Sequence, residues 1–397
     1  KYLKEWKSDE HKMPLIIKGC RQCGKTFSVL DFAHKNYEHV VYIDFFQHPE
    51  YKSVFDGGLD IDLLCMTLST LIPDANFVSG KTCIIFDEIQ ECPRARTALK
   101  FFKTDGRYDV IGTGSLLGVS GYHTNASSEA PIPVGYETII DMYPMDFEEW
   151  LWANGIKKMT IDYLHRCLEE KTPVQEAIHE RMRQLLLQYC IVGGMPRAVS
   201  VFMETHNMQN VLRMQQAIIE EYKVDMLKYA PQADKSRIRE CFESIPRQLS
   251  KENKKFAYAT VRSNGRGRDY QGSLQWIEDA GIIRRCYNLS APELPLDGNS
   301  IPDQFKVYMA DTGLFISMLE PGTAADILQG NLYGYKGAIF ENLVADIFGK
   351  MNRKLYYFRK DSGLEIDFVT RYEGKCTLVE VKASNGNIKS AKTILSN

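Results

Sequence analysis

Apolar runs of strand length alternate with helix-like segments from the start of the chain to about Trp152. The runs at 13–17, 40–44, 83–86 and 108–112 have the continuous apolar character of buried parallel strands. Such an alternation predicts a doubly wound α/β domain with a parallel sheet. We expect this domain to occupy residues 1–152.

The pattern becomes helical further along the chain. Between 160 and 229, apolar residues recur at helical spacing, and the residues at 193–196, two glycines, Met and Pro, interrupt them. We expect a helical lid region at 153–235. Residues 118–133 are rich in Gly, Ser, Asn and Pro, which predicts a long surface loop that is either a lid or disordered.

A third region combines a helix with a basic strand. Residues 269–280 fit a helix that ends at Gly281, and the strand-like segment 282–287 follows. This order is typical of a winged helix-turn-helix, which we expect at 236–310.

We expect a last domain at 311–397, where the sequence pattern predicts a helix followed by a hairpin. The helix covers 338–349 and precedes strands at 364–369 and 378–382. A turn at 372–375 joins the two strands.

A phosphate-binding motif follows the first strand. Residues 19–26 fit the pattern G-x-x-x-x-G-K-[ST], whose glycines let the backbone point its amides at an anion. We expect a nucleoside triphosphate here, with Lys25 reaching the β- and γ-phosphates and Thr26 ligating Mg²⁺. The alternative is a chance glycine-rich turn. The expected contact residues are Gly19, Cys20, Arg21, Gln22, Cys23, Gly24, Lys25 and Thr26.

Two further strand ends complete the expected nucleotide site. Asp87 and Glu88 end the run that starts at Cys83, where Asp87 would hold Mg²⁺ through water and Glu88 would polarise the attacking water. The alternative is a solvated strand end. The strand at 108–112 leads to Ser115, our candidate for sensing the γ-phosphate, with Thr113 as the fallback.

A second cluster of charged residues lies near the C-terminus. Alternation places Glu365 and Asp367 on one strand face, and the same period places Glu380 beside Lys382. Asp367 and Glu380 would ligate Mg²⁺ or Mn²⁺, Lys382 would orient water or steady the phosphate, and Glu341 would complete the site. This set suits phosphodiester cleavage. The alternative is alternating charge on an exposed hairpin.

The composition limits the number of domains and the ways in which the protein could bind DNA. The 397 residues are 44% hydrophobic and 25% charged, which predicts two to four domains. Lys and Arg total 49 against 51 Asp and Glu, so only a local patch could bind DNA. The candidates for such a DNA-binding patch are Arg262, Arg266, Arg268, Arg284 and Arg285. The alternative is that these arginines belong to a solvated face or to a scaffold that packs against neighbouring domains.

Ten cysteines show no disulfide framework, which suits reduced thiols in a cytosol. Cys20 and Cys23 form a C-x-x-C pair, but no second pair follows at metal-ligand spacing, so we do not expect a zinc or redox role. We expect a cytoplasmic protein without membrane association, because no apolar run approaches spanning length and no cleavable signal is visible. We also expect residues before Lys1 in the natural protein.

Several of these segments resemble the AAA-class ATP-binding proteins of archaea and bacteria. The matching motifs are Gly19-x-Arg21-Gln22-x-Gly24-Lys25-Thr26, Phe86-Asp87-Glu88-Ile89-Gln90, Gly112-Thr113-Gly114-Ser115, Met145-Asp146-Phe147-Glu148-Glu149, Gly193-Gly194-Met195-Pro196, Trp276-Ile277-Glu278-Asp279-Ala280-Gly281, Asp311-Thr312-Gly313-Leu314, Phe340-Glu341-Asn342 and Glu365-Ile366-Asp367-Phe368. The resemblance covers nearly the whole chain. It implies a P-loop, AAA-like ATPase core, a winged helix and an end similar to PD-(D/E)XK restriction nucleases.

The chain departs from that family at Tyr136, which follows Gly135 where the family usually has arginine. The candidates to replace this arginine as a phosphate-contacting arginine finger are Arg21, Arg94 and Arg197. AAA-type cores often take this arginine from a neighbour, which would favour a homo-oligomer. Two functions remain: an ATPase that controls a metal-dependent nuclease acting on DNA, and an ATP-driven switch or assembly factor whose nuclease-like domain is not catalytic.

Overall fold

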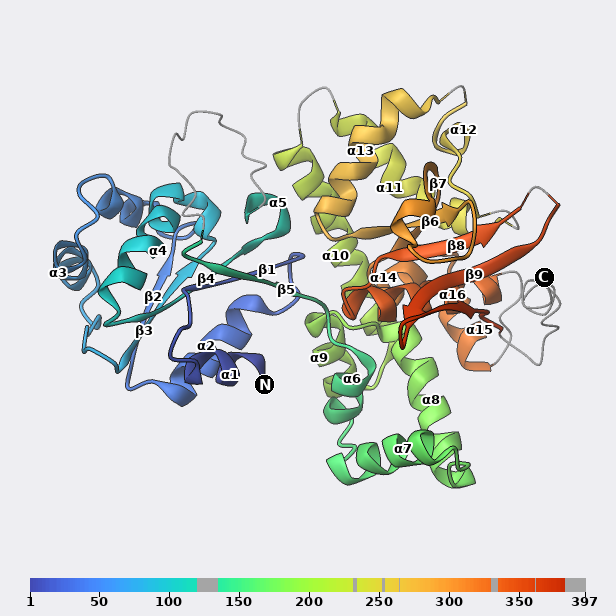
Figure 1. The fold of residues 1–397 in the computed structure, drawn as a ribbon, viewed down its shortest axis with the longest axis horizontal. Helices are drawn as coiled ribbons and strands as arrows, with labels where there is room; N and C mark the ends of the chain where they lie inside the picture. The colour runs from blue at the N-terminus through green and yellow to red at the C-terminus, as the bar shows by residue number, and fades with distance from the viewer. Residues whose placement is uncertain are drawn as a thin grey trace. The chain divides into compact units, whose positions relative to one another are not determined.

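The computed structural model describes residues 1–119, 135–230, 234–251, 254–263, 265–329, 335–360 and 362–382. The chain divides into two compact units, Lys1–Tyr143 and Pro144–Asn397 (Figure 1). This division places residues 144–152 in the second unit rather than in the predicted ATPase core. Most of the loop predicted at 118–133 lies outside the described residues.

The first unit contains a parallel five-stranded sheet in the order β2-β3-β4-β1-β5. Its strands are β1 (Leu15–Gly19), β2 (His39–Asp44), β3 (Thr82–Asp87), β4 (Asp109–Ser115) and β5 (Thr138–Met142). The connecting elements are α1 (Tyr2–Ser8), α2 (Lys25–Asn36), η1 (Pro49–Phe55), α3 (Ile61–Leu71), η2 (Ile89–Glu91), α4 (Pro93–Asp105) and α5 (Leu116–Val119). The four predicted strands are confirmed, whereas β5, a half-buried edge strand, was not predicted.

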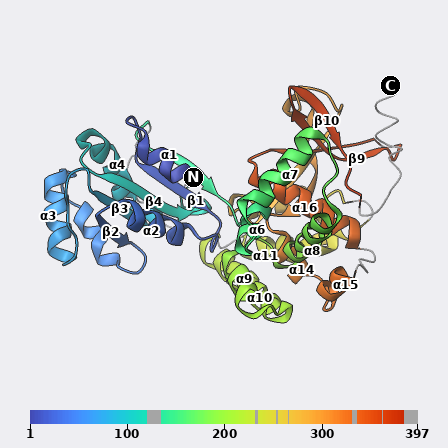
Figure 2. The ribbon, with the colours of Figure 1, turned by 90° about the horizontal axis from the view of Figure 1, so that it is seen from below.

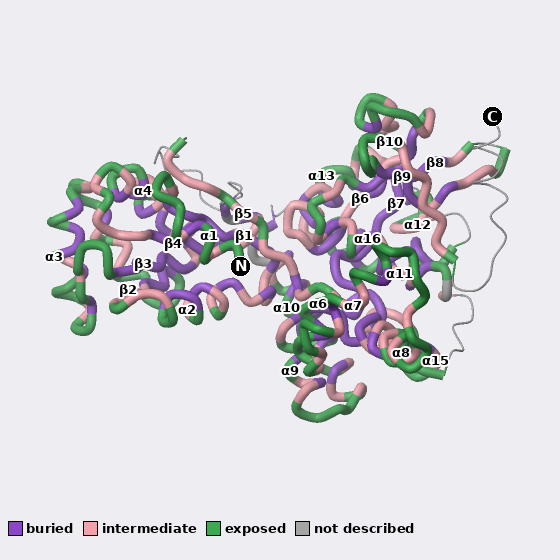
Figure 3. The backbone as a smooth tube through the Cα atoms, turned by 60° about the horizontal axis from the view of Figure 1, so that its bottom comes forward, coloured by how far each residue is buried: buried purple, intermediate pink, exposed green. Residues whose placement is uncertain are grey.

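Apolar side chains cover both faces of this sheet. On β3, Cys83 and Ile85 pack into the cluster that includes side chains of α1 and α2. Ile84 and Phe86 point to the opposite face and pack with α3 and α4. The strand is buried along its whole length, which is why its sequence is continuously apolar (Figure 3). The doubly wound α/β architecture is therefore confirmed.

Helices make up the first part of the second unit (Figures 1 and 2). They are α6 (Phe147–Ala153), α7 (Lys158–Glu170), α8 (Glu176–Val192), α9 (Pro196–Thr205), α10 (Met208–Tyr229), α11 (Lys235–Leu249), α12 (Tyr258–Val261) and α13 (Gly267–Asp279). The predicted interruption at 193–196 separates α8 from α9. Both α8 and α10 pack against α14 (Thr312–Ser317), so the region predicted as a lid belongs to the same unit as the C-terminal residues.

A mixed five-stranded sheet, in the order β10-β9-β8-β6-β7, completes this unit. The strands are β6 (Ile283–Leu289), β7 (Ser300–Met309), β8 (Leu355–Arg359), β9 (Glu365–Tyr372) and β10 (Lys375–Val379), and the remaining elements are η3 (Asp297–Asn299), α15 (Thr323–Gln329) and α16 (Lys336–Lys350). Because β6 pairs with β8, the boundary predicted at 310/311 passes through one sheet. The predicted final strand also ends early, at Val379, so Glu380 and Lys382 follow it.

Candidate functional site

The phosphate loop occupies the turn between β1 and α2. Gly19 ends the strand, and an added Cβ there would lie 2.4 Å from the Met142 carbonyl oxygen, so no larger residue fits. Arg21 and Gln22 form the turn, and Gly24 adopts a left-handed φ of 94° immediately before the helix. The loop therefore leads into the N-terminus of α2, where the amides of a helix favour an anion.

Lys25 is folded back onto this loop. Its side chain is buried, and Nζ donates to the carbonyl oxygens of Gly19, at 3.1 Å, and Cys20, at 2.9 Å. These carbonyls hold the ammonium group at the mouth of the loop.

Asp87 is the centre of a polar cluster at the carboxyl end of the sheet. Thr26 Oγ1 donates to Asp87 Oδ2 at 2.9 Å, and the Tyr42 hydroxyl donates to the same oxygen at 2.7 Å. The Thr113 hydroxyl hydrogen-bonds to Oδ1. A hydroxyl and a carboxylate are the hard oxygen donors that Mg²⁺ prefers, so Thr26 and Asp87 fit this ion. Tertiary contacts thus join two residues that the sequence separates by 61 positions.

Glu88 adopts an unusual backbone conformation directly after Asp87. Its φ of 50° is left-handed, which is costly for a residue with a Cβ and is found most often at functional sites. Burial raises the pKa of its carboxyl group above the ordinary value. A raised carboxyl pKa brings a group closer to the range in which it can exchange protons.

The two candidate γ-phosphate sensors differ in environment. Strand β4 lies between β1 and β3, and Ser115 is the residue paired with Gly19 at the start of the phosphate loop. Ser115 is half-buried, whereas Thr113 is fully buried and engaged with Asp87. Ser115 is therefore placed beside the loop, and Thr113 supports the carboxylate.

The substitutes for an arginine finger lie in both units. Arg21 is part of the phosphate loop, and its charge acts on Glu88. Arg94 donates to the backbone carbonyls of Phe55 and Gly57. Arg197 pairs with Glu221 at 3.1 Å in the second unit. Arg94 and Arg197 thus already have structural contacts.

The arginines predicted to bind DNA also have local contacts. Arg285 pairs with Glu278. Arg262 lies 4.0 Å from Glu240, and Arg268 lies 3.8 Å from Asp269. Arg284 faces Gly349, where an added Cβ would meet its guanidinium. Acidic neighbours therefore reduce the local positive charge that the sequence suggested.

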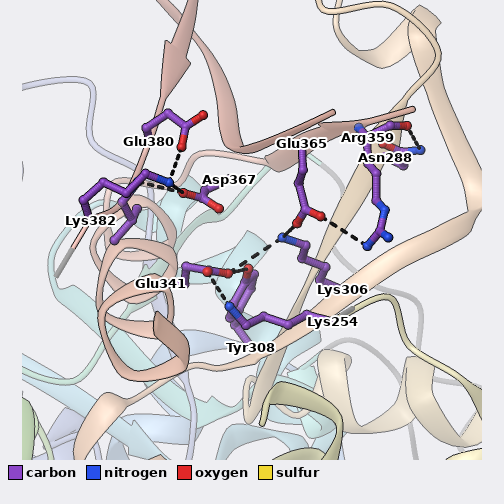
Figure 4. A network of polar contacts seen from close by, with 11 residues as sticks. Lys254, Asn288, Lys306, Tyr308, Glu341, Arg359, Glu365, Asp367, Glu380 and Lys382 are labelled. Atoms are coloured by element: carbon purple, nitrogen blue, oxygen red, sulfur yellow. Dashed lines mark hydrogen bonds and ion pairs between the residues drawn. The ribbon is translucent and has the colours of Figure 1, made fainter. Parts of the chain in front are cut away.

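The C-terminal cluster gathers the predicted carboxylates and Lys382 (Figure 4). Lys382 Nζ lies 2.6 Å from Glu380 Oε2 and 3.9 Å from Asp367 Oδ2. The Val381 amide donates to Asp367 Oδ2 at 2.8 Å, so the segment after β10 folds against β9. Burial, with the nearby charge of Glu341, raises the pKa of Asp367 to about 6.

Two lysines missed by the sequence analysis bind Glu341, which α16 carries into the cluster (Figure 4). Lys254 pairs with Oε1, and Lys306, which is 1% exposed, lies 3.7 Å from Oε2. The Tyr308 hydroxyl donates to Oε2 at 3.0 Å. Although burial opposes charge on Glu341, the two lysines lower its pKa. The sequence did contain a signal for Lys306: it is a charged residue inside the apolar run of β7, where a buried lysine needs an acidic partner.

The expected three-carboxylate metal site does not assemble within the described residues. In that part of the chain, no group of three or more His, Cys, Asp or Glu side chains is arranged to hold a metal ion. Lysines occupy the positions around these carboxylates where the sequence predicted a metal ion. Lys306 and Lys254 pair with Glu341, and Lys382 lies between Asp367 and Glu380.

Comparisons with known protein families assign a class to the first unit. The family model of an AAA domain matches residues 11–151. Models of two domains of unknown function, DUF8612 and DUF4143, match residues 183–324 and 336–397. The phosphate loop, Asp87 and Glu88 all lie within the first match. Residues 11–151, which carry these motifs, are therefore similar to an AAA domain.

Comparisons with whole proteins show only distant likeness. No curated protein matches the chain. The Walker-type ATPase PABY2304 of Pyrococcus abyssi is 13% identical, with 80% of this chain and 93% of that chain covered and a TM-score of 0.43. The Aeropyrum pernix ORC2 protein in its ADPNP–ADP complexes is 14% identical, with 83% and 91% covered and a TM-score of 0.37.

Among the described residues, no helix combines the length and the apolar character needed to cross a membrane.

Proposed function

We propose that this protein is a Mg²⁺-dependent ATPase whose nucleotide cycle controls a nuclease-like second unit that acts on DNA. The observation that carries the ATPase function is the contact between Thr26 and Asp87 beside a glycine-bounded phosphate loop. The geometry joins an anion-binding helix terminus to two oxygen donors for Mg²⁺.

Each group in this site has a proposed role. The loop amides bind the phosphates of ATP, and Lys25 exchanges its two carbonyl acceptors for phosphate oxygens. Thr26 and Asp87 would hold Mg²⁺. When bound, Mg²⁺ neutralises charge that develops on the transferred phosphoryl group.

Glu88 accepts a proton from, or orients, the water that attacks the γ-phosphate. Its burial and strained backbone support this role. Ser115 hydrogen-bonds to the γ-phosphate, while Thr113 keeps Asp87 in place. Arg94 and Arg197 already have structural contacts, so we propose that the arginine finger is Arg21 or an arginine from a second copy in a homo-oligomer.

DNA binding is proposed for the second unit. Helices α11 and α13 pack together, and the β6–β7 hairpin follows them, which supports a winged-helix arrangement. Asp367 lies on β9 of the same sheet, Glu341 lies on α16, and Glu380 and Lys382 follow directly after β10. The residue types of this C-terminal cluster match those of a restriction-nuclease-like site.

A second function for this cluster is that it binds nucleic acid without cutting it, so that the protein is an ATP-driven switch or assembly factor. One observation favours this alternative: Lys254 and Lys306 neutralise Glu341 from within the protein. A buried carboxylate that is already paired has less affinity for a metal ion. No catalytic step is assigned to the cluster for this reason.

ATP hydrolysis is tested by phosphate release from the full chain with ATP and Mg²⁺. We expect turnover by the wild type and none above background for Lys25→Ala, with Lys35→Ala as a control on the exposed side of α2. Equal rates for Lys25→Ala and the wild type would contradict the ATPase proposal.

Nuclease activity is tested separately by incubation with single- and double-stranded DNA and RNA, ATP, and Mg²⁺ or Mn²⁺. Cleavage that Lys382→Ala loses, and that the exposed-site variant Lys354→Ala retains, supports the nuclease. Absence of cleavage beyond the Lys382→Ala level favours the switch.

A further inference from the structure

The phosphate loop contains two cysteines that ATP hydrolysis does not use. Cys20 and Cys23 flank the turn formed by Arg21 and Gln22. The first and fourth Cα atoms of a β-turn lie within about 7 Å of each other. Disulfides join Cα atoms about 4.4–6.8 Å apart, so this turn holds the pair at a separation compatible with a bridge.

The two side chains also interact directly. A hydrogen bond from Cys20, followed by the charge of Lys25, outweighs burial and lowers the pKa of the Cys23 thiol to about 7. The Sγ atom of Cys23 lies 4.0 Å from Lys25 Nζ. In the chain, Cys23 directly precedes Gly24, which is the N-cap residue of α2. A neighbouring cation, a helix N-terminus and a C-x-x-C spacing each favour the thiolate, which is the reactive form of cysteine.

The other cysteines differ from this pair. All ten lie in the described part of the chain, and none forms a disulfide there. Burial raises the thiol pKa of seven of them: Cys65, Cys83, Cys92, Cys190, Cys241, Cys286 and Cys376. Oxidation should therefore begin at Cys23.

We propose that Cys20 and Cys23 are a modification site at which hydrogen peroxide forms a reversible disulfide that prevents ATP binding. This revises the expectation from spacing alone, and its effect on ATP rests on the proposed function of the loop. The Cys23 thiolate attacks one oxygen of peroxide, the O–O bond breaks, and the products are a sulfenic acid and hydroxide, which becomes water by taking up the proton that the thiol had released. The Cys20 sulfur then attacks Cys23 and displaces a second water, so two thiols are oxidised and peroxide is reduced.

Bridge formation must distort the loop because the surroundings of Cys23 are crowded. A disulfide brings the sulfurs to about 2.05 Å, much closer than a hydrogen bond does. Cys20 and Cys23 are both buried in this turn, so closing the remaining distance between their sulfurs shifts the loop backbone that carries them. The same backbone supplies the amides for phosphate and the carbonyls that hold Lys25.

The size of the oxidant follows from burial. Cys20 is 5% exposed and Cys23 is 1% exposed. Such burial favours reaction with a small neutral peroxide over reaction with a bulky disulfide reagent. A nucleotide bound in the loop should slow the reaction further.

Peptide mass spectrometry after a hydrogen peroxide titration tests the chemistry without reference to ATP. We expect the disulfide-linked Cys20–Cys23 peptide at the lowest peroxide concentrations and its reversal by dithiothreitol. Lys25→Ala should give the same product at higher peroxide concentrations, because it lacks the cation beside Cys23. Oxidation that begins at other cysteines, or gives no Cys20–Cys23 bridge, would overturn the proposal.

Binding of a fluorescent ATP analogue tests the consequence. Each protein is compared with its own reduced form, and we expect at least about tenfold weaker binding for the oxidised wild type. Cys376→Ser should keep this sensitivity because its thiol lies outside the loop, whereas the Cys20→Ser, Cys23→Ser double variant should lose it. Unchanged binding by fully bridged wild type would overturn the proposed block. A reduced protein that fails to bind the analogue would instead refute the proposed ATP binding.

Discussion

Replacement of Lys306 by Met should strongly destabilise the second unit. The ammonium group is 1% exposed and lies 2.6 Å from Glu365 Oε1 and 3.7 Å from Glu341 Oε2. Removing one partner of a buried ion pair leaves an uncompensated charge and costs about 3–5 kcal/mol. Glu341 keeps Lys254 and Tyr308, and Glu365 keeps Arg359, so we expect the lower end of that range.

The expected loss corresponds to a clear change in melting temperature. In a protein part of this size, 1 kcal/mol shifts the Tm by about 2–4 °C, so about 3 kcal/mol predicts a decrease of about 6–12 °C. Tryptophan fluorescence is a suitable probe because Trp150, Trp152 and Trp276 lie in the second unit and Trp6 alone lies in the first.

Two further variants distinguish charge burial from a general effect of the substitution. Lys354→Met removes an exposed lysine whose Nζ lies 2.7 Å from Asp297, and exposed pairs contribute only about 0–1 kcal/mol. Adding Glu365→Gln to Lys306→Met should recover part of the stability because it removes one of the two carboxylates that lost Lys306 as a partner. The reasoning is refuted if Lys306→Met melts within about 2 °C of the wild type, the shift expected for less than 1 kcal/mol.

Three other predictions concern the candidate sites. Glu88→Gln should bind the ATP analogue normally but hydrolyse ATP about 100-fold more slowly, because it cannot accept a proton; phosphate release measures this, and unchanged turnover would exclude the proposed role. Ser115→Ala should slow hydrolysis without changing the Tm, whereas Thr113→Val should lower the Tm because it removes a buried donor to Asp87; the opposite pattern would make Thr113 the sensor. Asp367 has a pKa of about 6, above the value of about 3.9 in an unfolded chain, so the folded state holds a proton that the unfolded state releases and stability falls as pH rises from about 4 through 6. Asp367→Asn should therefore raise the Tm at pH 8 relative to the wild type, with no difference below about pH 4, and a pH-independent difference would contradict this origin.

Local sequence was sufficient to predict the candidate nucleotide site. The spacing of Gly19, Gly24 and Lys25 is a property of eight consecutive residues, and strand β3 delivers Asp87 and Glu88 wherever its apolar run ends. Parallel strands place their carboxyl ends at one edge of a sheet, so the motifs were expected to meet. The AAA domain match at residues 11–151 agrees with that expectation.

Sequence periodicity located most elements of the second unit but not their assembly. It could not show that β6 pairs with β8, which joins two predicted domains in one sheet, because strand pairing is a long-range contact. It also extended the last strand to Lys382, although regular pairing stops at Val379.

Local patterns along the chain predicted a phosphate loop, two acids at a strand end and a set of charged residues near the C-terminus. They could not predict that Lys254, 87 residues before Glu341, and Lys306, from another strand, neutralise that carboxylate, because folding brings these segments together. The fold also brings the thiols of Cys20 and Cys23 into contact within the phosphate loop. Spacing along the chain specifies local motifs, whereas the charge balance of a buried site depends on every segment that packs around it.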